Sequence, residues 1–312
     1  FGLRTPVSMR MAMIENLACR EDYCHHICIF PARAAVVMQQ QDRGVMNVSA
    51  EEVFIGNGVS ELIDLTLRAL LNNGDEVLIP SPDYPLWTAA VTLNGGKAVH
   101  YRCPPENGFQ PDLDALAELI SERTSAMVII NPNNPTGAVY SREALEGMVA
   151  LAEKHGLVIF SDEIYDGMVY DDAQFFPIAP MVKNTLCGTF SGLSKVYRAC
   201  GFRVVWVSFS GTNELAKDYL QGLDLLASLR LCSNVPGQWG VQTALGGYQS
   251  LNKLVRPGGR LYESRQAIIR GVEASEYLKL MPPGGAMYAF VGVDTEKLPR
   301  SEERRVGKVG GG

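Results

Sequence analysis

The chain has 312 residues, of which 46% are hydrophobic and 20% are charged, values typical of a globular protein with a substantial core. Its formal net charge of −6 excludes a basic surface that would attract nucleic acid or anionic lipid, and no apolar run approaches the ~20 residues of a membrane span. Seven cysteines, an odd number spread along the chain, favour a reducing cytoplasm over a disulfide framework. Small-molecule partners are therefore expected.

Short apolar runs alternate with helical patterns from residue 51 onward. In chain order they predict a strand at 53–55, a helix from 56–58 through 71, a strand at 77–79, a helix at 86–93, a strand at 98–101, a helix at 112–121, a strand at 126–130, a helix at 141–155 with Ser141 as N-cap, and a strand at 157–160. Strands without polar alternation, each followed by a helix, predict an α/β fold with a mostly parallel sheet sandwiched by helices. A ligand is then expected at the carboxyl ends of the strands.

The rest of the chain divides less sharply. Residues 247–269 carry a helical pattern interrupted at 257–259, which we interpret as long helices leading into a smaller, incomplete α+β domain. We assign an N-terminal segment to 1–48, a large domain to 49–255, the start of a small domain to 256–299 and a tail to 300–312.

We expect the chain to be clipped at both ends. Its first ten residues lack an initiator Met and the charged-then-apolar order of a signal peptide. Residues 300–312 contain the string RSEERRVGK followed by VGGG, which resembles a translated sequencing adapter; the alternative is a disordered charged tail. The tail is excluded from the fold prediction.

Three segments carry the candidate chemistry. Lys195 lies in TFSGLSKVYRACGFRVVWV (189–207), which we interpret as a loop, eight positions before Arg203. Asp162 follows the strand at 157–160, and the turn-rich segment 131–137 (NPNNPTG) follows the strand at 126–130. In combination these segments resemble the aminotransferases of fold type I (class I and II), which use pyridoxal 5'-phosphate (PLP), and most closely the bacterial alanine aminotransferases. The resemblance covers about residues 51–293.

The resemblance implies roles for four residues. Lys195 holds PLP as a Schiff base and, once released, moves the Cα proton of the substrate. Asp162 pairs with the pyridine nitrogen and keeps it protonated. Tyr165 and Asn134 hydrogen-bond the phenolic oxygen of the cofactor, and Asn134 also helps to hold the substrate carboxylate. Taken singly, each residue has another interpretation: Lys195 as a surface lysine, Asp162 as a helix N-cap, Tyr165 as a packing tyrosine and Asn134 as part of a turn.

A phosphate site is expected where Gly58-Val59-Ser60 opens a helix directly after a strand, because backbone N–H groups and the helix dipole favour an anion there. Such loops are common and indicate only a phosphate ligand. The resemblance adds the guanidinium of Arg203 and the hydroxyl of Ser194 on the phosphate, and Tyr84 stacked on the pyridine ring. The alternative for Tyr84 is a tyrosine packed in a surface turn.

The resemblance further implies a homodimer, in which Tyr23 reaches the phosphate of the neighbouring subunit's cofactor. The sequence departs from the family at Cys28 and Val205, where glycines are expected. Cysteine and histidine crowd the segment around Tyr23, but their spacing lacks the second ligand pair of a zinc finger. We therefore predict no metal site from its members: Cys19, Cys24, His25, His26 and Cys28.

The implied reaction is amino transfer between L-alanine and 2-oxoglutarate by a ping-pong mechanism. The alternatives are an aspartate or aromatic aminotransferase, a Cβ–S lyase on the same fold, or a non-catalytic aminotransferase-like sensor domain. A sensor of that kind would carry a basic DNA-binding helix-turn-helix, and none is visible. Because the family's substrate-carboxylate arginine and closing glycine segment are expected beyond the two ends, we expect this chain to bind PLP but to turn over alanine poorly.

Overall fold

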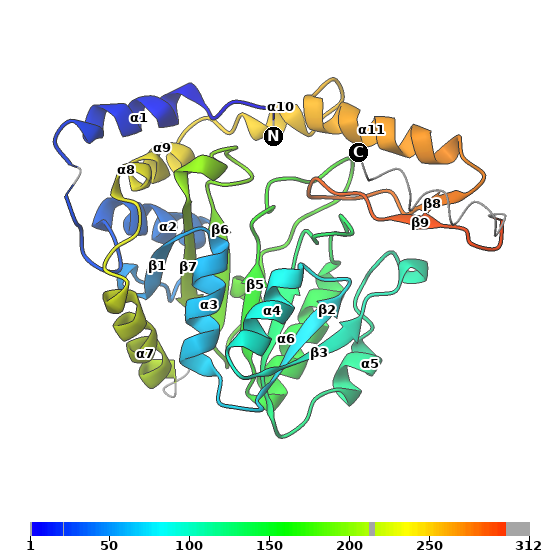
Figure 1. Ribbon diagram of the computed structural model, residues 1–312, viewed down its shortest axis with the longest axis horizontal. Coiled ribbons are helices and arrows are strands. Elements are labelled where there is room, and N and C mark those ends of the chain that lie inside the picture. The colour runs from blue at the N-terminus through cyan, green and yellow to red at the C-terminus, as the bar shows by residue number, and fades with distance from the viewer. Residues whose placement is uncertain (1, 21, 212–215, 298–312) are drawn as a thin grey trace, which may run out of the picture.

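A computed structural model describes residues 2–20, 22–211 and 216–297. The tail predicted at 300–312 lies outside the described residues. A central sheet with helices on both faces makes up most of the molecule, and α10, α11 and a short hairpin lie along one of its ends (Figure 1).

The sheet has seven strands in the order β1-β7-β6-β5-β4-β2-β3. β7 pairs antiparallel with both β6 and β1, and all other neighbouring pairs are parallel, so the sheet is mostly parallel, as predicted. The strand bounds are β1 Val53–Asn57, β2 Glu76–Ser81, β3 Lys97–Arg102, β4 Thr124–Ile130, β5 Val158–Asp162, β6 Cys187–Gly192 and β7 Val204–Ser210.

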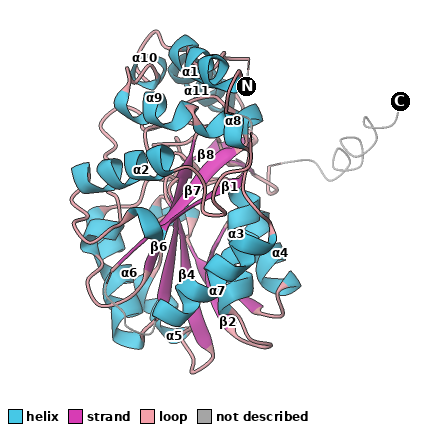
Figure 2. Cartoon of the chain, turned by 90° about the vertical axis from the view of Figure 1, so that its left-hand side faces the viewer, coloured by secondary structure: helices cyan, strands magenta, loops and turns pink. Residues whose placement is uncertain are grey.

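Helices cover both faces of the sheet because the inner strands present apolar side chains on each face. On β4, Val128 faces a core shared with α3, α4 and α7, whereas Met127 and Ile129 face a core shared with α5 and α6. Figure 2 shows α3 and α4 on one side of the strands and α2 and α6 on the other. The helix bounds are α1 Val7–Leu17, α2 Phe30–Asp42, α3 Val59–Leu70, α4 Pro85–Leu93, α5 Leu113–Glu118, α6 Arg142–His155, α7 Ala216–Leu229, α8 Val235–Gln238, α9 Gly240–Gly246, α10 Leu251–Leu254 and α11 Arg260–Glu273.

The predicted elements between residues 53 and 160 all form, with ends that differ by a few residues. The expected cap is present, because Ser141 accepts a hydrogen bond from the Ala144 N–H at 3.1 Å at the start of α6. Asp112 caps α5 in the same way, through the Ala115 N–H at 3.1 Å.

Two predictions for the second half were wrong. Residues 189–207 are not all loop, because β6 and β7 occupy both ends of the segment and only 193–203 connect them. β6 escaped notice because its small residues give no apolar run, although all six are buried; at Gly188 a Cβ would lie 2.9 Å from the Phe209 ring. Residues 247–269 are not long helices throughout, since α10 has four residues and the long helix α11 begins only at Arg260, after a turn in which Gly258 has φ +82°.

A second, two-stranded sheet pairs β8 (Leu278–Leu280) with β9 (Val291–Val293). The segment between these strands returns to the large sheet's edge: the Gly285 N–H donates to the Gly137 carbonyl at 2.8 Å, and the Ala286 N–H donates to the Met168 carbonyl at 2.8 Å. A Cβ on Gly137 would lie 2.3 Å from Cβ of Pro283. This close approach fixes residues 283–288 against the loops that follow β4 and β5.

Candidate active site

The candidate site is a cavity of about 240 Å³ at the carboxyl ends of the parallel strands. Strands β1, β2, β4, β5 and β6 all end at this edge, as expected for a ligand site in a parallel sheet. The antiparallel strand β7 begins there, so Arg203, just before it, joins the same edge. The cavity is lined by Val59, Ser60, Tyr84, Asn134, Asp162, Ile164, Tyr165, Ser194, Lys195, Cys200, Arg203, Val205 and Tyr288.

Lys195 sits in the tight connection between β6 and β7. The connection is closed by hydrogen bonds from the Leu193 N–H to the Val204 carbonyl at 2.9 Å and from the Ala199 N–H to the Leu193 carbonyl at 3.0 Å. The Lys195 ammonium lies 6.0 Å from the centroid of the Tyr165 ring. The primary amine of Lys195 therefore belongs to the lining of the cavity, which contains no other lysine among the described residues.

Asp162 ends β5 and is buried, with 2% of its surface exposed. Its carboxylate accepts hydrogen bonds from the Ile164 N–H at 3.3 Å and from the Trp87 indole N–H at 3.5 Å. Burial raises the pKa of Asp162 to about 6, although these two donors and the nearby charge of Lys195 act in the opposite direction. A carboxylate held in this way would be stabilised by a cation placed in the cavity.

Tyr165 and Tyr288 meet across the cavity. Their hydroxyl oxygens lie 2.7 Å apart, and their rings are edge-to-face with centroids 5.6 Å apart. Burial, followed by the contact with Tyr288, raises the pKa of Tyr165 well above its ordinary value, so the phenol stays protonated and is available as a donor.

An anion cradle lies where β1 passes into α3. Gly58 precedes the first turn of α3 with φ +102°, and the guanidinium of Arg203 fills the space beside it: Nη2 donates to the Asn57 carbonyl at 3.2 Å, and Nη1 donates to the Cys200 carbonyl at 3.2 Å. A Cβ on Gly58 would lie only 1.8 Å from Nη2 of Arg203. Only glycine allows the guanidinium to lie this close to the backbone at the start of α3. The helix N-terminus and the guanidinium together favour the binding of an anion.

The structure brings together nine of the predicted site residues. Listed by position they are Val59, Ser60, Tyr84, Asn134, Asp162, Tyr165, Ser194, Lys195 and Arg203, with Gly58 beside Arg203 at the cradle. Tyr23 is not among them, because its side chain is 84% exposed and lines a separate surface hollow with Trp239.

Four cavity residues were not predicted from the sequence: Ile164, Cys200, Val205 and Tyr288, of which Val205 was noted only as a departure from the family. Ile164 lies within the already predicted Asp162–Tyr165 turn, and Cys200 lies between Lys195 and Arg203, so proximity in sequence was an available signal for both. Tyr288 had none, because its placement depends on the long-range contacts of residues 283–288 with the loops after β4 and β5.

In the segment rich in cysteine and histidine, the side chains contact one another and neighbouring polar groups. His26 Nε2 lies 2.7 Å from Asp224 Oδ1, and the rings of His25 and His26 lie 4.1 Å apart. Within residues 2–20, 22–211 and 216–297, no group of three or more His, Cys, Asp or Glu side chains is placed to hold a metal ion. In the same part of the chain, no helix has the length and apolar character needed to cross a bilayer.

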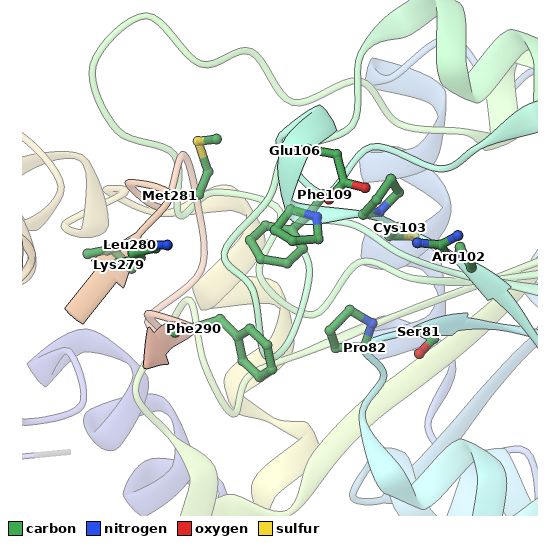
Figure 3. A pocket seen from close by; sticks show the side chains of 13 residues that line it. Ser81, Pro82, Arg102, Cys103, Glu106, Phe109, Lys279, Leu280, Met281 and Phe290 are labelled. Carbon is green, nitrogen blue, oxygen red and sulfur yellow. The ribbon is translucent and has the colours of Figure 1, made fainter. Parts of the chain in front are cut away.

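A larger cavity of about 620 Å³ lies between the ends of β2 and β3 and the β8–β9 hairpin. Figure 3 shows Phe109 and Phe290 reaching into it, and their rings pack edge-to-face with centroids 5.9 Å apart. Its lysine, Lys279, is bound to Asp294 at 2.9 Å. Although larger, this cavity lacks the buried carboxylate and the anion cradle, so we assign the chemistry to the smaller one.

This mostly parallel sheet, with a lysine, a buried carboxylate and an anion cradle at the carboxyl ends of its strands, has the fold of a fold type I aminotransferase. The family described as "Aminotransferase class I and II" matches residues 29–305, and the chain belongs to this family.

Relatives of known name agree with the family assignment. The glutamate-pyruvate aminotransferase AlaA of Escherichia coli K12 is 47% identical over 306 residues, which cover 98% of this chain and 76% of that protein. The alanine aminotransferase of Mycobacterium tuberculosis H37Rv is 48% identical over 297 residues, covering 95% of this chain and 69% of that protein. The crystal structure of an aminotransferase from Escherichia coli matches with a TM-score of 0.95 at 47% identity, over 98% of this chain and 76% of that one.

Proposed function

We propose that the chain is a PLP-dependent aminotransferase acting on L-alanine and 2-oxoglutarate, with Lys195 as the amine that reacts with the cofactor aldehyde. The observation that carries the proposal is that one lysine and the buried carboxylate of Asp162 line the same cavity, which also contains an anion cradle. Each of these three groups matches a different part of PLP: its aldehyde, its ring nitrogen and its phosphate.

The described residues fit the cofactor. The cradle of Gly58, the α3 N-terminus and Arg203 suits a phosphate, because a doubly charged group there is met by N–H donors and a guanidinium. The hydroxyls of Ser60 and Ser194 line the same cavity. Asp162, whose pKa is raised by burial without a full counter-charge, suits the protonated nitrogen of a pyridine ring.

PLP supplies an aldehyde for the substrate amine and a cationic ring that accepts electrons released at Cα. When not joined to the cofactor, the amine of Lys195 would act as the general base for the Cα proton. Asp162 would keep the ring nitrogen protonated. Tyr165, which is protonated and hydrogen-bonded to Tyr288, would donate to the phenolic oxygen. Asn134 would bond the same oxygen and the substrate carboxylate, and Tyr84 would stack on the ring; both residues line the cavity.

The substrate assignment draws on the names of relatives. Both the glutamate-pyruvate aminotransferase AlaA and the mycobacterial alanine aminotransferase are nearly half identical to this chain over most of its length. At such identity over most of the chain, a shared reaction is the simplest expectation.

We further propose a homodimer in the cytoplasm, with Tyr23 reaching the neighbouring subunit's phosphate. The exposure of Tyr23, 84% in the single chain, supports a role at a subunit boundary. All seven cysteines are free, which suits a reducing compartment.

A single-turnover experiment tests the reaction. The chain, loaded with PLP and freed of excess cofactor, is mixed with L-alanine; we expect one pyruvate per bound cofactor without ammonia release, and further pyruvate only after 2-oxoglutarate is added. Lys195→Ala is the matched control and should form no pyruvate. Repeated formation of pyruvate and ammonia without an amino acceptor would instead establish a lyase and overturn the assignment.

A further inference from the structure

The backbone of Asn57 holds the guanidinium of Arg203 at the anion cradle. Asn57 is the last residue of β1, and its carbonyl accepts the hydrogen bond from Arg203 Nη2 at 3.2 Å. Arg203 has a φ of +58°, in the left-handed region that an L-residue keeps only where its surroundings enforce it. The position of this cation therefore depends on contacts made outside Arg203 itself.

Glu61 fixes Asn57 from the first turn of α3. Its carboxylate oxygen Oε2 accepts the Asn57 N–H at 2.6 Å, and Oε1 accepts the side-chain amide of Asn57 at 3.3 Å. Gly56 leaves room for this contact, since a Cβ there would lie 2.9 Å from Glu61 Oε2. Because the acceptor is charged, the carboxylate restrains Asn57 more firmly than a neutral group would.

The carboxylate of Glu61 is paired with Arg230. α7 packs along α3 (Figure 1), and Arg230, directly after α7, donates from Nη1 to Glu61 Oε2 at 2.8 Å. The same guanidinium donates to the Ile55 carbonyl at 3.0 Å and to the His26 carbonyl at 3.0 Å. An unpaired carboxylate in the first turn of α3 would repel a phosphate, whereas the ion pair holds Asn57 with less of that repulsion.

A second contact ties Asn57 to the chain just before Arg203. The side-chain oxygen of Asn57 accepts the Asn234 N–H at 2.8 Å, and Asn234 Nδ2 donates to the Phe202 carbonyl at 3.2 Å. The helix that Asn234 caps, α8, lies close to the same carbonyl, since a Cβ on Gly237 would be 2.9 Å from it. Asn57 is thus joined both to the guanidinium of Arg203 and to the backbone that carries it.

We propose that Glu61 is a positioning residue of the phosphate site, and that it acts through Asn57 on the guanidinium of Arg203. The inference rests on the proposed function, in which the phosphate of PLP occupies the cradle. Glu61 does not line the cavity, so its effect on the phosphate is indirect. A guanidinium that is already held in place loses less freedom when the phosphate binds, and this strengthens binding.

Positioning and charge predict opposite results for Glu61→Ala. If the negative charge were the main influence of Glu61 on the cradle, removing it would tighten the binding of a phosphate. If positioning dominates, the substitution releases Asn57 and Arg203 and weakens binding. We expect PLP to bind about fivefold more weakly to Glu61→Ala. The affinity for 5'-deoxypyridoxal, which has the same aldehyde and ring but no phosphate, should be unchanged.

Two conservative variants separate charge from reach, and both affinities are measured by titrating the ligand-free chain. Glu61→Gln loses the charge but keeps an oxygen that can accept the Asn57 N–H, so PLP should bind within about twofold of the wild type. Glu61→Asp keeps the charge but is too short for this contact, so PLP should bind about threefold more weakly. Asp64→Ala is the matched control, because it removes a carboxylate of the same helix that is bound to Arg68 and Asn94.

A double-mutant cycle shows whether Glu61 acts through Arg203. Arg203→Ala removes the guanidinium, so in that background Glu61→Ala should change the PLP affinity by less than about twofold. The positioning role is overturned by unchanged or tighter binding of PLP to Glu61→Ala and Glu61→Asp, by an equal loss in the Arg203→Ala background, or by an equal loss for 5'-deoxypyridoxal.

Titration with inorganic phosphate separates this inference from the proposed function. If the wild type binds phosphate but not PLP, the proposed function fails, and about fivefold weaker binding of phosphate to Glu61→Ala still supports the positioning role. If PLP binds as expected but Glu61→Ala and Glu61→Asp leave its affinity unchanged, only the positioning role fails. If the wild type binds neither ligand, both fail.

Discussion

The hydroxyl oxygens of Tyr165 and Tyr288 lie 2.7 Å apart, although 123 positions separate the two residues in the sequence. Tyr165 follows β5, whereas Tyr288 arrives from the segment between β8 and β9 that is tied to Gly137 and Met168. Part of the lining of the site is thus supplied by a segment near the end of the described chain.

Tyr288→Phe should lower kcat/KM for amino transfer roughly threefold to tenfold, because it removes one neutral hydrogen bond that orients the Tyr165 hydroxyl while the edge-to-face ring contact persists. In a Tyr165→Phe background the same change should have no effect, since its partner is already absent. Tyr248→Phe, at an exposed position, is the control. Equal effects of Tyr288→Phe in both backgrounds would refute the orienting role.

Gly58→Ala should weaken PLP binding about tenfold or more, because the added Cβ would lie 1.8 Å from Nη2 of Arg203 and must displace it. Gly108→Ala is a matched control: Gly108 also has positive φ, at +61°, but a Cβ there meets nothing within 4 Å. Both variants should lose about 1 kcal/mol of unfolding free energy from backbone strain, and titration with PLP should separate them. Equal affinities in the two variants would remove Gly58 and Arg203 from the phosphate site.

Asp162→Asn should abolish most amino transfer and also change how the ligand-free chain responds to pH. The folded-state pKa of Asp162, about 6, is raised above its ordinary value of 3.8, so the stability that the neutral carboxyl contributes is complete below pH 4 and is lost as pH rises through 6. Relative to Asp162→Asn, the unfolding free energy of the wild type should fall by about 3 kcal/mol across that window. Glu163, whose pKa burial raises to about 7, is common to both chains and cancels. The unfolding free energies of the two chains are measured by denaturant titration at each pH. Parallel pH profiles would show that burial does not raise the pKa of Asp162.

The strands and helices between residues 53 and 160 could be predicted because their short apolar runs and helical patterns are separated by Gly, Pro or capping residues. Ser141, for example, both precedes the α6 pattern and accepts the Ala144 N–H. β6 could not, since its Cys, Gly, Thr and Ser residues are buried by their neighbours rather than by their own hydrophobicity. The break at Gly258 could be predicted from the sequence. The sequence did not indicate that α10 has only four residues.

The candidate site was predictable where its residues follow strands directly. Asp162 ends β5, Gly58 follows β1 and Arg203 precedes β7, so their positions relative to the sheet edge follow from the chain order. The position of Tyr288 depends on contacts of its segment with Gly137 and Met168, which no local sequence pattern predicts. Tyr23 lies away from the cavity of its own chain, and its proposed role depends on a second subunit.

Reductive trapping identifies the lysine that carries the cofactor, which we propose to be Lys195. The chain is loaded with PLP, reduced with borohydride and digested, and the labelled lysine is identified by mass. We expect a visible absorbance band that disappears on reduction, with the label on Lys195 alone, and neither band nor label in Lys195→Ala. A stable label on any other lysine, or an unchanged band in Lys195→Ala, would contradict it.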